Sequence, residues 1–115
     1  MKKIYYLSTC STCNRIIKEL QLDNSFDFQD IKSNQITTEQ IEQMKKMSGS
    51  YESLFSRRSM KFKSMGLKDK SLSENDFKKL ILKEYTFLKR PVIIIDDKVF
   101  IGNSKKVVEA VADKL

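Results

Sequence analysis

The spacing of apolar and polar residues predicts a strand, a helix and a second strand in the first third of the chain. Residues 4–7 form a short apolar run typical of a buried strand. The apolar residues after it recur at the i, i+3, i+4, i+7 spacing of one helix face: Cys13, Ile16, Ile17 and Leu20. Alternation over residues 26–31 indicates the second strand. A helix between two strands implies a parallel pair, and we expect Ser11 or Thr12 to cap this helix.

The middle of the chain, approximately residues 36–86, is predicted to be a mostly helical insert. Two capping boxes mark helix starts, each a hydroxyl residue followed three positions later by a side chain that can bond back: Thr37 with Gln40, and Ser73 with Asp76. Gly49 is expected to end the first of these helices. Residues 51–66 have an interrupted helical pattern.

The end of the chain returns to strand. Residues 92–95 and 99–101 are apolar and are separated by a turn at Asp96-Asp97, which predicts a hairpin. A last helix follows, with Asn103 or Ser104 as its cap. The predicted order is therefore β-α-β, the helical insert, and β-β-α.

Size and composition predict one compact, soluble domain over residues 1–115. The chain is 40% hydrophobic and 32% charged, with a mean hydropathy of -0.45. It contains no histidine, which excludes catalysis by histidine and histidine-ligated metals, and its two cysteines cannot complete a structural zinc site. No apolar run approaches the roughly 20 residues of a membrane span. We expect no metal site, no membrane contact and a reducing, cytoplasmic location in which cysteines stay reactive.

The net charge of +7 is concentrated in one stretch. Residues 57–90 hold eleven basic and four acidic side chains, whereas the segments before and after are neutral. Such a field could attract a small anion, a nucleic acid or an acidic protein surface, or it could be a solvated helix face without a ligand. No groove-reading motif accompanies it, so direct binding of nucleic acid is not expected.

The run Cys10-Ser11-Thr12-Cys13 is the strongest chemical motif. Two cysteines three residues apart at a helix start lie within disulfide reach, and helix amides would stabilise a thiolate on Cys10. Cys10 is then the nucleophile and Cys13 a resolving thiol. The small residue Thr12 leaves the loop open to substrate. The alternative is that Cys13 only packs in the core and that Cys10 is an incidental thiol.

Three segments together resemble the ArsC/Spx family of arsenate reductase-like proteins: Tyr5 to Cys13, Arg57 to Leu67, and Leu88 to Ile93. The resemblance covers essentially the whole chain. It implies an α/β, thioredoxin-like βαβ...ββα three-layer sandwich with a helical insert. It also implies a catalytic Cys10, a catalytic Arg90 before a cis Pro91, and Arg58 as a basic substrate-binding residue from the insert, with Thr12 and Pro91 also lining the substrate site. Planar arginine forks suit a tetrahedral oxyanion.

The resemblance implies a thiol oxidoreductase that acts on arsenate, another small oxyanion or a disulfide. The chain binds no cofactor in this reading; glutathione with glutaredoxin, or thioredoxin acting through Cys13, would return the electrons. The resemblance implies that arsenate reductases of this fold have one essential cysteine in the motif and an arginine after the last hairpin. This chain differs at both places: it has a second cysteine, Cys13, and it has Gly102-Asn103 in the later region. Both departures resemble Spx-like proteins. The alternative is therefore a redox-switched transcriptional regulator that binds the alpha subunit of RNA polymerase.

Overall fold

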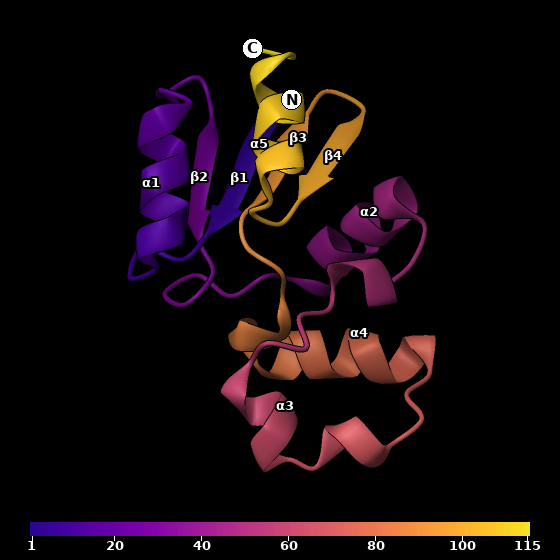
Figure 1. The fold of residues 1–115 in the computed structure, drawn as a ribbon. Helices are drawn as coiled ribbons and strands as arrows, with labels where there is room; N and C mark the ends of the chain where they lie inside the picture. The colour runs from indigo at the N-terminus through magenta and orange to yellow at the C-terminus, as the bar shows by residue number, and fades with distance from the viewer. The chain divides into compact units, whose positions relative to one another are not determined.

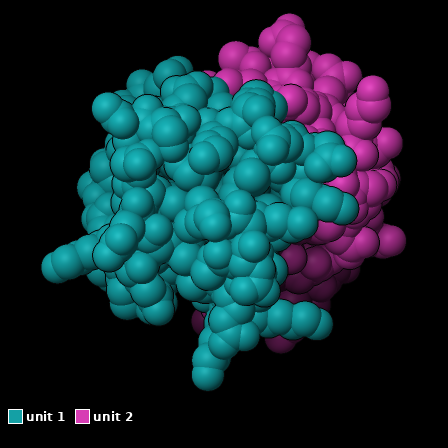
Figure 2. All heavy atoms as spheres, turned by 90° about the horizontal axis from the view of Figure 1, so that it is seen from above, with its two compact units in different colours: residues 1–34, 90–115 teal, residues 35–89 magenta.

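The computed structural model describes all residues 1–115 and divides the chain into two compact units. Unit 1 combines residues Met1–Asn34 with Arg90–Leu115, and unit 2 is the continuous segment Gln35–Lys89. Figure 2 colours unit 1 teal and unit 2 magenta. No helix in the structure is both long enough and apolar enough to cross a membrane.

Unit 1 is built on a mixed sheet of four strands in the order β2-β1-β3-β4 (Figure 1). Its elements in chain order are β1 (Lys2–Tyr6), α1 (Ser11–Glu19), β2 (Asp27–Asp30), β3 (Val92–Ile95), β4 (Lys98–Ile101) and α5 (Lys105–Ala112). Strands β1 and β2 are parallel, and β3 is antiparallel to both β1 and β4. The predicted β-α-β unit and hairpin are thus confirmed. Asp96 takes the hairpin turn with φ 54°, a left-handed conformation that aspartate tolerates.

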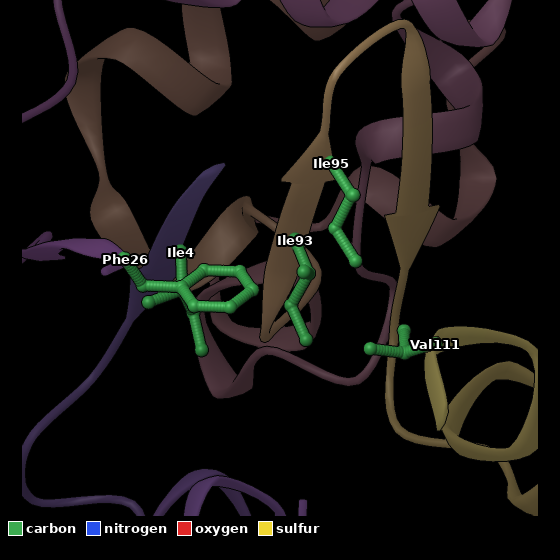
Figure 3. Packing of buried hydrophobic residues seen from close by; sticks show 5 residues of the cluster. All are labelled: Ile4, Phe26, Ile93, Ile95 and Val111. Atoms are coloured by element: carbon green, nitrogen blue, oxygen red, sulfur yellow. The ribbon is translucent and has the colours of Figure 1, made fainter. Parts of the chain in front are cut away.

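The core of unit 1 lies between the sheet and its two helices. Figure 3 shows five of its side chains, which converge from three strands or their flanks and from α5: Ile4, Phe26, Ile93, Ile95 and Val111. Ile17 and Leu20 of the α1 segment pack against the same cluster, so both helices cover one face. Burying each large aliphatic side chain here contributes about 1.5 to 3 kcal/mol. Strand β3 is buried at every position, which explains its unbroken apolar sequence.

Unit 2 is helical, as its periodicity predicts. It contains α2 (Thr38–Ser48), α3 (Met60–Ser64) and α4 (Glu74–Lys83), with single 3₁₀ turns η1 (Glu52–Leu54), η2 (Leu67–Asp69) and η3 (Tyr85–Phe87). Both predicted capping boxes are confirmed. Gly49 ends α2 with φ 99°, a conformation in which a side chain would be strained.

An aromatic cluster forms the centre of unit 2. The Phe55 ring lies 4.9 Å from that of Phe77 and 5.0 Å from that of Phe87, measured between centroids. The Arg57 guanidinium lies over the Phe77 ring at 5.5 Å and pairs with Glu52 at 2.8 Å. Arg57 therefore serves the packing of this unit.

Candidate functional site

The loop between β1 and α1 places Cys10 at the start of a helix. The Cys10 N–H donates to the Leu7 carbonyl at 2.9 Å, which closes a turn directly after the strand. Cys10 is itself the N-cap residue of α1, with extended backbone angles of -91° and 113°. The prediction that Ser11 or Thr12 caps this helix is wrong, because the turn at Leu7 begins the helix one residue earlier than expected. α1 therefore starts without a side-chain cap.

The Cys10 thiol is half-buried and its pKa is lowered. Burial acts against ionisation and is the largest single influence. It is outweighed by hydrogen bonds from the Cys13 N–H, the Cys13 thiol and the Thr12 N–H, together with the positive charge of Arg90. Amides at the first turn of a helix have no partner within the helix, so they are available to a thiolate. This arrangement makes Cys10 the more nucleophilic of the two thiols.

The Cys13 thiol has the opposite character. Its residue is fully buried, and this burial raises its pKa to about 11, although a hydrogen bond from the Leu7 backbone and the charge of Arg90 act in the other direction. The negative charge on Cys10 also contributes to this raised pKa. Both cysteines are free thiols. The pair therefore consists of one sulfur whose thiolate is favoured and one sulfur whose protonated thiol is favoured.

Arg90 and Pro91 lie where β3 begins, beside the same loop. In the antiparallel register Tyr5 pairs with Val92, so the residues before Val92 run alongside the end of β1. Arg90 is half-buried and its charge acts on both cysteines. Pro91 is buried, and the Arg90–Pro91 peptide bond is cis. Unit 1 thus contains five of the six predicted site residues: Cys10, Thr12, Cys13, Arg90 and Pro91.

Arg58 belongs to unit 2, in the segment between η1 and α3. Its side chain is exposed and makes no hydrogen bond or ion pair, in contrast to that of Arg57. Of the two adjacent arginines, Arg58 is the one whose guanidinium is available for a ligand. Its role in substrate binding stays a prediction.

Three polar residues that sequence reasoning missed hold the loop. The Ser8 hydroxyl donates to Asp30 Oδ2 at 2.5 Å, and the Asn14 side-chain amide donates to the Ser8 carbonyl at 2.9 Å. Asp30 ends β2, whereas Asn14 lies in the first turn of α1. The only sequence signal was the polar character of positions 8, 14 and 30, since their contacts depend on strand pairing. No group of three or more cysteine, aspartate or glutamate side chains is arranged to hold a metal ion.

Comparison with known proteins places the chain in a family. The model of the ArsC family matches residues 5–111. This chain belongs to the ArsC family. The resemblance that rests on residues 5–13, 57–67 and 88–93 is therefore confirmed.

Individual ArsC-family relatives and similar structures agree with this assignment. The chain is 27% identical over 106 residues to the global transcriptional regulator Spx 2 of Bacillus anthracis, covering 89% of this chain and 79% of that protein. A possible arsenate reductase from Streptococcus mutans has 26% identity and a TM-score of 0.73, covering 96% of this chain and 97% of the other. A putative ArsC-related protein from Bacteroides fragilis has 21% identity and a TM-score of 0.80, covering 96% of each chain. The fold is thus the α/β, thioredoxin-like fold of ArsC proteins, as predicted.

Proposed function

We propose that this ArsC-family protein is a thiol oxidoreductase in which Cys10 is the nucleophile and Cys13 the resolving thiol. The observation that carries this proposal is the opposite ionisation of two sulfurs at one helix start: the pKa of Cys10 is lowered and that of Cys13 is raised to about 11. A nucleophile whose thiolate is favoured and a partner that stays protonated until needed are the two components of dithiol exchange.

With a disulfide substrate, the Cys10 thiolate attacks one substrate sulfur. A mixed disulfide forms, the substrate S–S bond breaks, and one substrate thiol leaves with the electron pair and a proton from water. Cys13 then attacks Cys10 Sγ, which forms the Cys10–Cys13 disulfide and releases the second thiol. The substrate gains two electrons and the protein loses two. Glutathione with glutaredoxin, or thioredoxin, would return them in the reducing cytoplasm where we place the protein.

The first step itself activates Cys13. A negative charge on Cys10 raises the pKa of Cys13, and the Cys13 thiol donates a hydrogen bond to Cys10. Both influences weaken when Cys10 becomes part of a neutral mixed disulfide. The pKa of Cys13 then falls while the charge of Arg90 continues to favour its thiolate. Cys13 therefore becomes a better nucleophile only after Cys10 has attacked the substrate.

With arsenate, the Cys10 thiolate would form an S–As bond and displace one arsenic-bound hydroxyl, which takes a proton from solvent and leaves as water. Attack by Cys13 or glutathione on Cys10 Sγ breaks the S–As bond and leaves its electron pair on arsenic, which is reduced from arsenic(V) to arsenic(III). Arg90 supports this reading because its charge favours both thiolates, and the resemblance implies Arg58 as a second cation for the anion. Thr12 and Pro91 complete the proposed substrate site. Arg58→Ala should slow turnover of arsenate several-fold, whereas Lys61→Ala, which removes another exposed cation, should not.

The deciding experiment measures Cys10-dependent turnover of arsenate and of a glutathione mixed disulfide. Each substrate is assayed with glutaredoxin coupling and with thioredoxin coupling. We expect turnover with at least one combination, its loss in Cys10→Ser, and loss of only the thioredoxin-coupled rate in Cys13→Ser. Absence of turnover in all four combinations would overturn the enzymatic function.

A second candidate function is redox-switched regulation of transcription. It is favoured by the similarity over 106 residues to a protein described as a global transcriptional regulator, Spx 2. In this case the Cys10–Cys13 disulfide would change the affinity for the alpha subunit of RNA polymerase. Retention of purified alpha subunit on the immobilised protein, different between reduced and oxidised states, supports this function. Absence of retention in both states contradicts it.

A further inference from the structure

The turn that carries Cys10 is anchored on two sides through one residue, Ser8. Ser8 follows Leu7, whose carbonyl accepts the Cys10 N–H at 2.9 Å and closes the turn. On one side the Ser8 hydroxyl donates to Asp30 Oδ2 at 2.5 Å, and the Ser8 N–H lies 3.5 Å from Oδ1. On the other side the Ser8 carbonyl accepts from the Asn14 amide at 2.9 Å. The hydroxyl and the carbonyl of Ser8, an exposed residue, are thus both hydrogen-bonded.

The Asp30 carboxylate is itself held in place. Asp30 pairs with Tyr6 in the parallel register of β2 and β1, which brings its backbone beside the end of the strand that leads into the turn. Its Oδ1 also accepts the Lys32 N–H at 3.2 Å. The pKa of Asp30 is lowered, first by the hydrogen bond from the Ser8 hydroxyl, so the group is a carboxylate at neutral pH. A charged acceptor with fixed partners makes a stronger hydrogen bond than a neutral one.

We propose that Asp30 is a positioning residue for the Cys10 nucleophile: through Ser8 it holds the turn that presents Cys10 to the first amides of α1. This inference rests on the proposed function, since it deepens the account of the same nucleophile. The amides of Thr12 and Cys13 reach the Cys10 sulfur only while Cys10 stays at the N-cap position. Release of Ser8 would let the turn move and would weaken those hydrogen bonds.

The direction in which the Cys10 pKa changes when Asp30 is removed distinguishes a positioning role from a purely electrostatic one. A carboxylate near a thiol, acting by its charge alone, raises the thiol pKa, so that its removal would lower it. A carboxylate that positions the turn does the reverse, and its removal raises the pKa. Ser8→Ala removes the same link without changing any charge. Asp30→Ala and Ser8→Ala therefore shift the Cys10 pKa in the same direction under the proposal.

The experiment records the pH profile of Cys10 alkylation by iodoacetamide, with the modified residue identified by mass spectrometry. We expect Ser8→Ala and Asp30→Ala each to raise the pKa of Cys10 and to slow alkylation at pH 7 about threefold to tenfold. Ser8→Thr, which keeps the hydroxyl, should restore the profile. Asp27→Ala is the matched control, because it removes an exposed carboxylate of the same strand that pairs with Lys3.

An unchanged profile in Ser8→Ala, or a lower Cys10 pKa in Asp30→Ala, overturns the proposal. Circular dichroism establishes that each variant is folded, and Ser8 is exposed, so its truncation leaves no cavity. Turnover is measured in parallel. Profiles that shift as expected without any turnover would support positioning and contradict the proposed enzyme. Turnover with unshifted profiles would do the opposite.

Discussion

The exposed start of α1 and the buried side of its first turn hold two cysteines with opposite properties. Cys10 is half-buried, faces the helix amides and has a lowered pKa, whereas Cys13 is fully buried and has a pKa raised to about 11. Their intrinsic chemistry is the same and they are separated by two residues. The difference arises because a helix end offers free N–H groups, while one turn later those groups are used and the side chain faces the core. Position within a single helical turn therefore assigns the chemical roles.

The largest expected effect follows from removing the exposed thiol. Cys10→Ser should lower the rate of alkylation at pH 7 by about a hundredfold or more, because the remaining thiol, Cys13, is fully buried and burial is the largest cause of its raised pKa. Iodoacetamide labelling followed by peptide mapping measures the rate. Cys13→Ser serves as the control and should retain fast labelling; its loss of labelling would mean that the two roles are reversed.

The pH dependence of stability should differ in sign between the two thiols. The folded-state pKa of Cys10 lies below its ordinary value of 9.0, so its contribution is fully present above pH 9 and is lost as the pH falls through the folded pKa. The folded-state pKa of Cys13 is raised to about 11, so its contribution is present below pH 9 and is lost as the pH rises through 11.

Urea unfolding of the reduced protein between pH 7 and 11 tests this difference. The wild-type free energy of unfolding should fall by about 1 to 2 kcal/mol more than that of Cys13→Ser between pH 9 and 11. Tyr5, whose pKa burial and Asp27 raise to about 12, contributes alike in both proteins and cancels in the comparison. Parallel curves for the two proteins would contradict the raised pKa of Cys13.

The next prediction concerns the charge of Arg90, which lowers the pKa of Cys10. Arg90→Ala removes a cation that favours both thiolates, and we expect it to raise the Cys10 pKa and to slow alkylation at pH 7 about twofold to fivefold. Arg15→Ala is the control, since Arg15 lies on the exposed face of α1 and pairs with Glu19 at 3.5 Å. Equal effects of the two substitutions would show that only net charge matters.

The smallest expected effect concerns Thr12 and distinguishes its backbone N–H from its side-chain hydroxyl. Thr12→Pro deletes the N–H that bonds to Cys10 and should slow alkylation about twofold, because other donors remain. Proline is tolerated in the first turn of a helix. Thr12→Ala keeps the N–H and should leave the thiol pKa unchanged. A raised pKa in Thr12→Ala would transfer the role to the hydroxyl.

Local sequence patterns predicted most of the fold because they act over a few residues. Each of the two capping boxes, Thr37 with Gln40 and Ser73 with Asp76, needs only one helical turn to form. The apolar run that became β3 is unbroken because both of its faces are buried. The cap of α1 was missed by one residue, since the turn closed by Cys10 and Leu7 depends on backbone geometry that small polar residues do not specify.

The candidate site was predictable only in part. The Cys10-Ser11-Thr12-Cys13 spacing indicated the two thiols, and the family resemblance indicated Arg90 beside Pro91. The link from Ser8 to Asp30 spans 22 residues and exists because β1 and β2 pair in one particular register. The raised pKa of Cys13 likewise depends on burial by the folded core. Sequence spacing thus identifies the two thiols, whereas the groups that change their pKa values and hold their loop come from tertiary pairing.

The discontinuous build of unit 1 has a consequence for synthesis of the protein. The cysteines are translated early, yet Arg90, the strand β3 and the core residue Val111 follow only after the whole of unit 2. Domains generally fold as units during translation, so the continuous unit 2 can fold before unit 1 is complete. Until then both thiols lack the positive charge of Arg90, which lowers both pKa values. A chain interrupted before residue 90 would keep the amides of the first turn of α1 but would lack this charge and strand β3, so the final properties of both thiols are reached only in the last stage of translation.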